Sequence, residues 1–131
     1  MTRREAMEAN AREAALLNNG ISIEDAEALR RISMTLHRWH ERECGIDGGC
    51  IERDELTQKT YWLNSFSGRR SPIADRETGA LKRLAAIMAR YPTLRAYVQG
   101  DPRGAALYIL RPNDAPVGQE DSMYSRGLVV Y

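Results

Sequence analysis

Two stretches at the start of the chain have the spacing of apolar and polar residues that predicts helices. The first spans residues 3–18, and it follows a T-x-x-E sequence formed by Thr2 and Glu5. In such a capping box the threonine hydroxyl accepts a hydrogen bond from a backbone N–H of the first turn. The Asn-Asn-Gly sequence at 18–20 favours a helix end. Because most of its apolar residues are small, we expect residues 1–20 to dock loosely against the rest of the chain.

The second helix is predicted by a longer apolar stripe. Its apolar residues recur every three or four positions and therefore share one face. They are Ile23, Ala26, Leu29, Ile32, Leu36 and Trp39. Ser22 supplies an N-cap, and Cys44-Gly45 marks the end of the helix. Since only a short turn separates the two helices, we expect an antiparallel helical hairpin.

Short runs rich in β-branched and aromatic residues, bounded by turn residues, predict strands in the rest of the chain. The predicted strands span residues 50–53, 59–64, 69–71, 94–98, 105–110 and 127–131. The stretches at 45–49 and 100–104 have the glycine-rich composition of turns, and residues 112–121 form a polar loop.

A third helix is predicted between the two groups of strands. It covers residues 72–90 or 75–90, with Ser71 as the N-cap of the longer version. Gly79 would lie inside this helix and weaken it by about 1 kcal/mol relative to alanine. The element order lacks a regular strand–helix–strand alternation. We therefore expect an α+β fold with an N-terminal helical hairpin and a mostly antiparallel sheet, with the third helix packed on one face. Residues 1–131 should form a single domain.

Composition is that of a folded protein of the cytoplasm. Hydrophobic residues make up 43% of the chain and charged residues 28%, as in ordinary globular domains. No apolar run reaches the roughly 18 residues that span a bilayer, and the first residues lack the apolar segment of a secretory signal. We expect no contact with a membrane. The pI of about 7.8 lies below the value of about 9 that is typical of dedicated nucleic-acid binders.

The basic residues are unevenly distributed along the chain. Residues 1–66 contain 9 basic and 12 acidic residues, whereas residues 67–131 contain 10 and 6. All basic residues except Lys59 and Lys82 are arginines, which bind carboxylates and phosphates through two parallel hydrogen bonds. A GC-rich genome produces the same bias without any functional role. The second half of the chain therefore allows a basic face without demonstrating one.

One group of potential metal ligands lies at the end of the second helix. His40 and Cys44 are four positions apart and share a helix face, and Cys50 follows across a glycine-rich loop. Either His37 or Glu41 would supply a fourth ligand, and zinc takes four such ligands tetrahedrally. In the alternative interpretation Cys44 is a small buried hydrophobe, and the histidines complement the helix dipole. No cofactor other than zinc is suggested.

Catalytic motifs are absent from the sequence. It contains no nucleophile elbow, phosphate-binding loop or dinucleotide-binding fingerprint. Its two histidines are three positions apart, with the glutamate after the second, which differs from the H-E-x-x-H metalloprotease pattern. Cys44 with His40 as base would make a nucleophilic pair, but such pairs are more often accidental. We therefore expect a protein that is not an enzyme.

The segment around Tyr61 and Trp62, with the arginines after it, is a candidate binding surface. Residues 59–69 resemble the central hairpin of a WW domain, without that family's flanking tryptophans, and we interpret the hairpin as structural. One of the two aromatic residues should be buried, and the other should be exposed as a binding anchor. A basic patch would form if the hairpin and the third helix lie together. Its members would be Arg69, Arg70, Arg76, Arg83 and Arg103.

The chain resembles a group of small, mostly uncharacterised proteins of phages and prophages of proteobacteria. The resemblance covers residues 39–112 and the end of the chain. It is carried by the strings CGIDGGCIERDE, YWLNSFSGRRSPIADRETGALKRLAAIMARYP, AYVQGDPRGAALYILRP and SRGLVVY. It implies a phage or mobile-element accessory protein, and small accessory proteins of this kind without catalytic motifs are often inhibitors of bacterial defence, including anti-CRISPR proteins.

The leading functional hypothesis is therefore a non-enzymatic inhibitor that binds a host defence protein, most plausibly a CRISPR–Cas component, by steric occlusion in the bacterial cytoplasm. The alternatives are a nucleic-acid-binding phage accessory protein and a small zinc-binding domain. The expected partner-binding residues are Trp62, Arg69, Arg70, Arg76 and Arg103.

Overall fold

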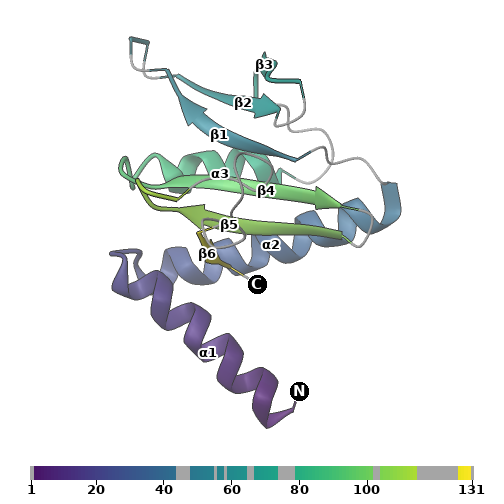
Figure 1. Cartoon of the computed structure of the whole chain (residues 1–131), viewed down its shortest axis with the longest axis vertical. Helices are drawn as coiled ribbons and strands as arrows, with labels where there is room; N and C mark the ends of the chain where they lie inside the picture. The colour runs from purple at the N-terminus through teal and green to yellow at the C-terminus, as the bar shows by residue number, and fades with distance from the viewer. Residues whose placement is uncertain are drawn as a thin grey trace.

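The computed structural model is an α+β fold in which two helices cover one face of a six-stranded sheet (Figure 1). It describes residues 2–43, 48–54, 56–57, 59–64, 67–73, 79–101, 104–114 and 127–130, without the side chains of 39–43, 100–101 and 104–105. In chain order the elements are α1 (Arg3–Asn18), α2 (Ile23–Glu43), β1 (Gly49–Arg53), β2 (Thr60–Asn64), β3 (Arg70–Ser71), α3 (Ala80–Met88), β4 (Arg95–Asp101), β5 (Gly104–Leu110) and β6 (Leu128–Val129).

The sheet is antiparallel throughout, with strand order β3-β2-β1-β4-β5-β6. β1 lies at its centre, where Cys50 pairs with Leu63 of β2 and with Tyr97 of β4. β3 and β6 are edge strands of two residues each, and edge strands this short offer little template for further pairing. The fold class expected from the sequence is confirmed.

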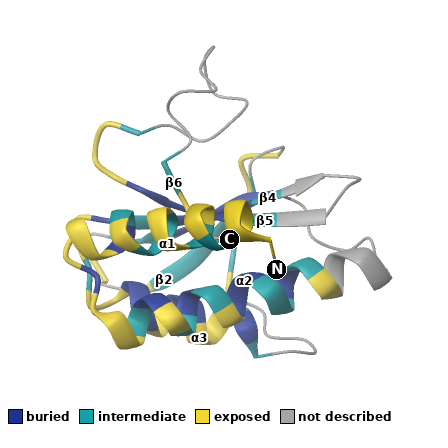
Figure 2. Ribbon diagram, turned by 90° about the horizontal axis from the view of Figure 1, so that it is seen from below, coloured by how far each residue is buried: buried dark blue, intermediate teal, exposed yellow. Residues whose placement is uncertain are grey.

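Local capping explains the first two helices. The Thr2 hydroxyl accepts a hydrogen bond from the backbone N–H of Glu5 at 3.1 Å, and the Ser22 hydroxyl accepts one from Asp25 at 3.1 Å. The two helices form the predicted hairpin, which turns at Gly20 with φ 87°. The hairpin is open, because α1 diverges from α2 and extends away from the sheet (Figure 1). Figure 2 shows α1 as largely exposed, and Leu16 is the buried residue of this helix.

The predicted start of the third helix is wrong. Ser71 ends β3, where a strand was predicted, and pairs with Trp62, but residues 72–73 after it are not helical. Helix α3 begins after Gly79, which takes the left-handed conformation with φ 69° instead of lying inside the helix. The cap signal of Ser71 is therefore not used by a helix. Residues 74–78 lie outside the described residues, and α3 ends at Met88.

The remaining differences concern the lengths of strands. β4 and β5 extend to Asp101 and from Gly104, into the stretch expected to be a turn. β6 covers two residues instead of the five predicted. Gly127 precedes it with φ 86°, in close approach to the carbonyl oxygen of Ile109. A side chain at this position would clash with β5, so the sequence requires glycine here.

The core lies between the sheet and the helices, and alternation along the strands determines which residues reach it. Ile51, Ala96, Val98, Leu107 and Ile109 face α2 and α3 and are buried. The helices contribute apolar residues at helical spacing. Their fully buried side chains include Leu29, Leu36 and Leu84. The alternate strand residues form a second buried cluster on the other face. It contains Cys50, Tyr97, Tyr108 and Leu110.

Candidate interaction surface

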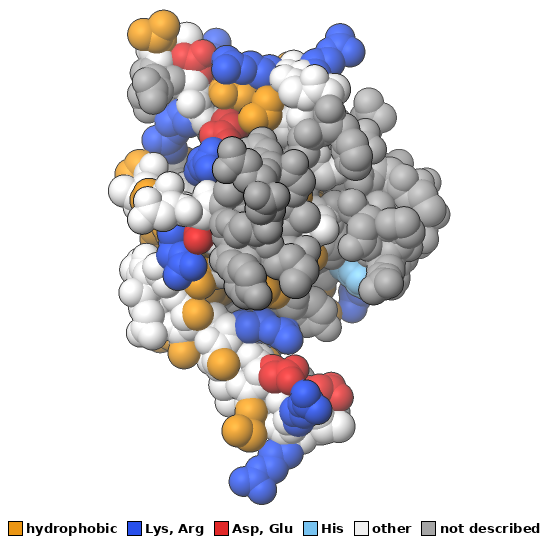
Figure 3. Space-filling model, viewed as in Figure 1, with side chains coloured by type: hydrophobic (Ala, Val, Ile, Leu, Met, Phe, Trp, Pro, Cys, Tyr) orange, Lys and Arg blue, Asp and Glu red, His pale blue; other side chains and the backbone are white. Residues whose placement is uncertain are grey.

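The structure places three of the five predicted partner-binding residues at the β2–β3 end of the sheet. Arg69 and Arg70 are exposed, whereas Trp62 is half-buried. Arg76 and Arg103 lie outside the described residues. Figure 3 shows basic side chains gathered over β2 and β3, at the top of the view. Arg69 and Arg70 therefore have the exposure that a binding residue needs, whereas Trp62 is not an exposed anchor.

Trp62 packs against the main core instead of forming an exposed anchor. Its indole lies across the backbone of Gly49, because a Cβ built on that glycine would be 2.5 Å from Cζ2 of the tryptophan. Only a residue without a side chain leaves this space free. Gly49 pairs with Asn64, which lies on the same face of β2 as Trp62. In the sequence Gly49 belongs to a run of turn glycines, so no local signal identified Trp62 as the inward-facing residue.

Tyr61 is also half-buried, but it lies on the opposite face of β2 from Trp62. Successive strand residues point to opposite faces, so Tyr61 faces away from the helices when Trp62 faces them. The Cζ atom of Arg70 lies 4.9 Å from the centre of the Tyr61 ring, which is the geometry of a cation–π contact. We call Tyr61, Arg69 and Arg70 the arginine edge.

The turn before β3 holds the arginine edge in place. The Asn64 side chain accepts a hydrogen bond from the backbone N–H of Ser67 at 3.0 Å. The Ser67 hydroxyl accepts a hydrogen bond from the backbone N–H of Arg69 at 3.1 Å. Gly68 takes φ 68° between them. Nearby, backbone N–H groups of Thr57 and its neighbour lower the pKa of Asp54, and the charge of Arg70 adds to this effect. The edge is thus a defined, positively charged feature.

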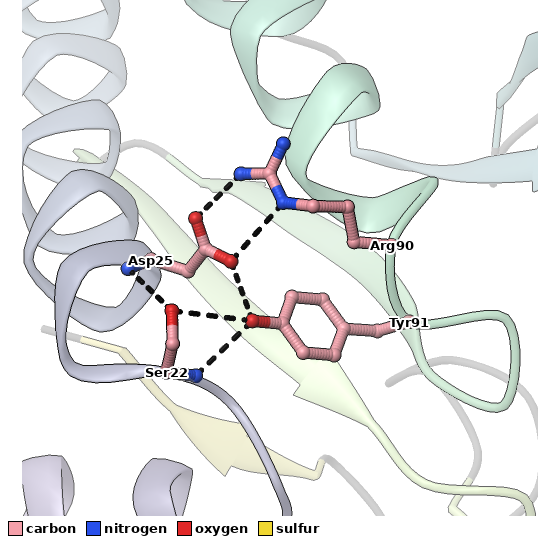
Figure 4. Close-up of polar contacts among 4 residues, drawn as sticks. All are labelled: Ser22, Asp25, Arg90 and Tyr91. Atoms are coloured by element: carbon pink, nitrogen blue, oxygen red, sulfur yellow. Dashed lines mark hydrogen bonds and ion pairs between the residues drawn. The ribbon is translucent and has the colours of Figure 1, made fainter.

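A second polar cluster, the Asp25 network, joins the start of α2 to the end of α3 (Figure 4). Arg90 contacts the Asp25 carboxylate through Nε at 3.2 Å and Nη2 at 2.5 Å, and the Tyr91 hydroxyl donates to it at 2.5 Å. The backbone N–H of Ser22 donates to the Tyr91 oxygen at 3.1 Å. The hydrogen bonds from Arg90, with a smaller contribution from Tyr91, lower the pKa of Asp25.

The chemistry of the Asp25 network is structural. An ionised Asp25 cannot act as a general acid at neutral pH. The Ser22 hydroxyl serves as the N-cap of α2, and the network contains no histidine that could activate it. Every group drawn in Figure 4 links the two helices, so we assign this cluster to stability.

Cys50, the third residue of the proposed zinc site, is 4% exposed within the second apolar cluster. Burial raises the pKa of its thiol to about 12, and the charge of Glu52 adds to this shift. A thiol in this environment is protonated and unsuited to nucleophilic attack. Cys44 and the side chain of His40 lie outside the described residues. Among the described residues, no three His, Cys, Asp or Glu side chains come together as a metal site.

Comparison of the chain with models of protein families, with curated proteins and with solved structures found no match. Within the described part of the chain, no helix combines the length and the apolar character needed to cross a bilayer. The basis for a functional assignment is therefore the chain's own surface chemistry.

Proposed function

We propose that this protein is a non-enzymatic phage or mobile-element protein that binds and inhibits a bacterial defence component, most plausibly a CRISPR–Cas protein. The observation that carries the proposal is the arginine edge. Arg69 and Arg70 are both exposed, and Tyr61 orients one of them. The resemblance to phage and prophage proteins supports the choice of a defence component as the partner.

The arginine edge suits recognition of an acidic protein surface. Tyrosine and arginine are enriched among the residues that dominate binding energy at interfaces. A guanidinium stacked on a ring is already restrained, so less side-chain entropy is lost when it binds a carboxylate. Inhibition would follow by occlusion, because an inhibitor seated here covers a surface that the defence protein uses for DNA or for another subunit.

A nucleic-acid-binding accessory protein is the second candidate, because the same arginines can contact phosphates. The two hypotheses differ in their salt dependence. Affinity for DNA falls steeply with salt as counterions are released, whereas a protein interface with buried aromatic anchors depends on it less.

The experiment is capture of partners by the tagged protein from a proteobacterial lysate with an active CRISPR system, followed by mass spectrometry. A Cas protein recovered in stoichiometric amount with the wild type, and lost with R69E/R70E, is the expected result. The variant R3E/R4E is the matched control, because it changes the same number of charges at exposed positions of α1. Equal capture by R69E/R70E would show that the arginine edge is not the binding site.

A parallel titration with labelled duplex DNA at several salt concentrations separates the two candidates. Recovery of DNA alone, with a steep loss of affinity as salt rises, would favour the nucleic-acid-binding hypothesis over the inhibitor.

A further inference from the structure

A basic cleft lies between the β1–β2 hairpin and helix α3, and the arginine edge takes no part in its lining. The cleft has a volume of about 600 Å³. Its charged residues are Arg53, Lys59 and Lys82, and its floor includes Ala85, Ala86 and Ala89 of α3. We call this feature the lysine cleft.

Both lysines of the chain line this one cleft, although every other basic residue is an arginine. Lys59 comes from the strand side and Lys82 from the helix, and both are exposed. Among the described residues, neither lysine forms an ion pair. The arrangement brings like charges from two elements together, and their repulsion is relieved when an anion lies between them.

Arg53 lines both the lysine cleft and a second hollow beside it. Its Nη2 donates to the carbonyl oxygen of Ala89 at 3.3 Å, which satisfies a carbonyl at the end of α3. Arg53, Thr60 and Ala89 also line this hollow of about 310 Å³, so the two depressions lie next to each other. The lining of this hollow is mixed, because Met88, Pro92 and Leu94 are apolar whereas Glu52 and Arg95 are charged.

We propose that the lysine cleft binds an acidic peptide segment of a protein partner, with carboxylates between the lysines and an apolar side chain in the adjoining hollow. The lysine ammonium groups can bind carboxylates, and the alanine methyl groups can contact apolar side chains. A peptide that contains both acidic and apolar residues therefore fits the cleft. Because the two depressions share Arg53, Thr60 and Ala89, neighbouring side chains of one peptide can occupy both.

The lining is less suited to nucleic acid. Proteins that bind single strands stack bases on aromatic rings, and no aromatic residue lines either depression among the described residues. The adjoining hollow also carries the Glu52 carboxylate, which Arg95 contacts at 2.6 Å. A continuous row of phosphates would meet that carboxylate, whereas a peptide can present an apolar residue there.

The two lysines provide their own probe. Reductive methylation of the full chain with isotope-labelled methyl groups marks Lys59, Lys82 and the terminal amine, and methylated lysine keeps its charge. A peptide of alternating glutamate and leucine is then titrated while the methyl resonances are followed by NMR. Both lysine signals should shift together and saturate. Unchanged lysine signals at millimolar peptide would overturn the proposal.

Two competitors, oligothymidine and inorganic phosphate, test whether the cleft binds any anion instead of a peptide. Neither should displace the peptide at equal anion concentration. Displacement by oligothymidine would identify a nucleic-acid site, and displacement by phosphate would identify a simple anion site. Either result would overturn the peptide proposal.

Variants localise the site. K59E/K82E should weaken peptide binding about tenfold or more, since two attractions become repulsions. A86E is a second, independent test because it places a carboxylate on the cleft floor at an exposed position. R3E/R4E carries the same charge change and should bind the peptide normally. R69E/R70E should also bind it normally, and this result keeps the proposal distinct from the function proposed for the arginine edge.

Discussion

The hydroxyl oxygen of Tyr91 lies 2.5 Å from Oδ2 of Asp25, although 66 positions separate the two residues in the sequence. The contact fixes the segment that follows α3 against the first turn of α2. Arg90 approaches the same carboxylate, and the Tyr91 ring packs against the main core. The polar contact thus aligns the two helices that cover the sheet.

Tyr91→Phe is expected to destabilise the fold by about 1–2 kcal/mol, because Ser22 and Asp25 both lose a hydrogen-bond partner while the ring keeps its packing. Chemical denaturation of the variant and the wild type measures the difference. Tyr61→Phe is the matched control, since the Tyr61 hydroxyl has no hydrogen-bond partner within the described residues. Equal stability of Tyr91→Phe and wild type would refute a stabilising role for this hydroxyl.

The stabilising effect of Asp25 should depend on pH. Its pKa is lowered in the folded state, chiefly by hydrogen bonds from Arg90, so folding favours the ionised carboxylate. This contribution is complete above the unfolded pKa of about 3.9, and it is lost as the pH falls through the lowered folded value.

The measurement is the difference in unfolding free energy between wild type and Asp25→Asn across this range. The difference should be constant near neutral pH and shrink below about pH 4. Comparing the two proteins cancels the titration of Asp54 and Asp114, whose pKa values are also lowered. A difference that stays the same into strong acid would contradict the assignment.

Cys50 should resist modification in the folded protein. Its side chain is 4% exposed, and burial raises the pKa of the thiol to about 12, so little thiolate is present near neutral pH. In a Cys44→Ser variant, a thiol reagent at about pH 8 should react slowly before denaturation and completely after it. Rapid reaction of the folded variant would show that Cys50 is accessible and ionised, and would reopen a chemical role for it.

Gly49→Ala should destabilise the protein through Trp62. The added methyl would lie 2.5 Å from the indole and 2.6 Å from the Leu63 carbonyl oxygen, an overlap that costs about 1–3 kcal/mol. Thermal unfolding followed by circular dichroism gives the effect. Gly68→Ala is the comparison, since its φ is 68° and nothing lies within 4 Å of the added methyl. It should lose about 1 kcal/mol from backbone strain alone.

A double-mutant cycle tests whether the indole causes the effect of Gly49→Ala. In the background Trp62→Ala, the added methyl meets the carbonyl but no ring, so the two substitutions should be non-additive. Strict additivity would contradict the packing of Trp62 on Gly49.

The sequence by itself determined the features that depend on neighbours within one helical turn. Thr2 and Ser22 cap the first two helices through residues three positions later, so α1 and α2 begin where their sequence signals predict. The composition of the strands likewise indicated the α+β class, because the runs of β-branched and aromatic residues are local. The exposure of Arg69 and Arg70 was predictable for the same reason, since both follow a recognisable turn.

Tertiary structure decided the features that depend on residues far apart in the chain. Ser71 ends the strand predicted at 69–71, but the start of α3 after Gly79 did not follow from its local cap signal. Strand alternation alone does not tell which of two adjacent aromatic residues faces the core. Trp62 faces it because its indole fills the space above Gly49. Lys59 and Lys82 are the two lysines of the chain, but they line one cleft only because α3 packs beside the β1–β2 hairpin. Local signals cannot encode such contacts, because their energy comes from burial and pairing between segments that meet only in the folded chain.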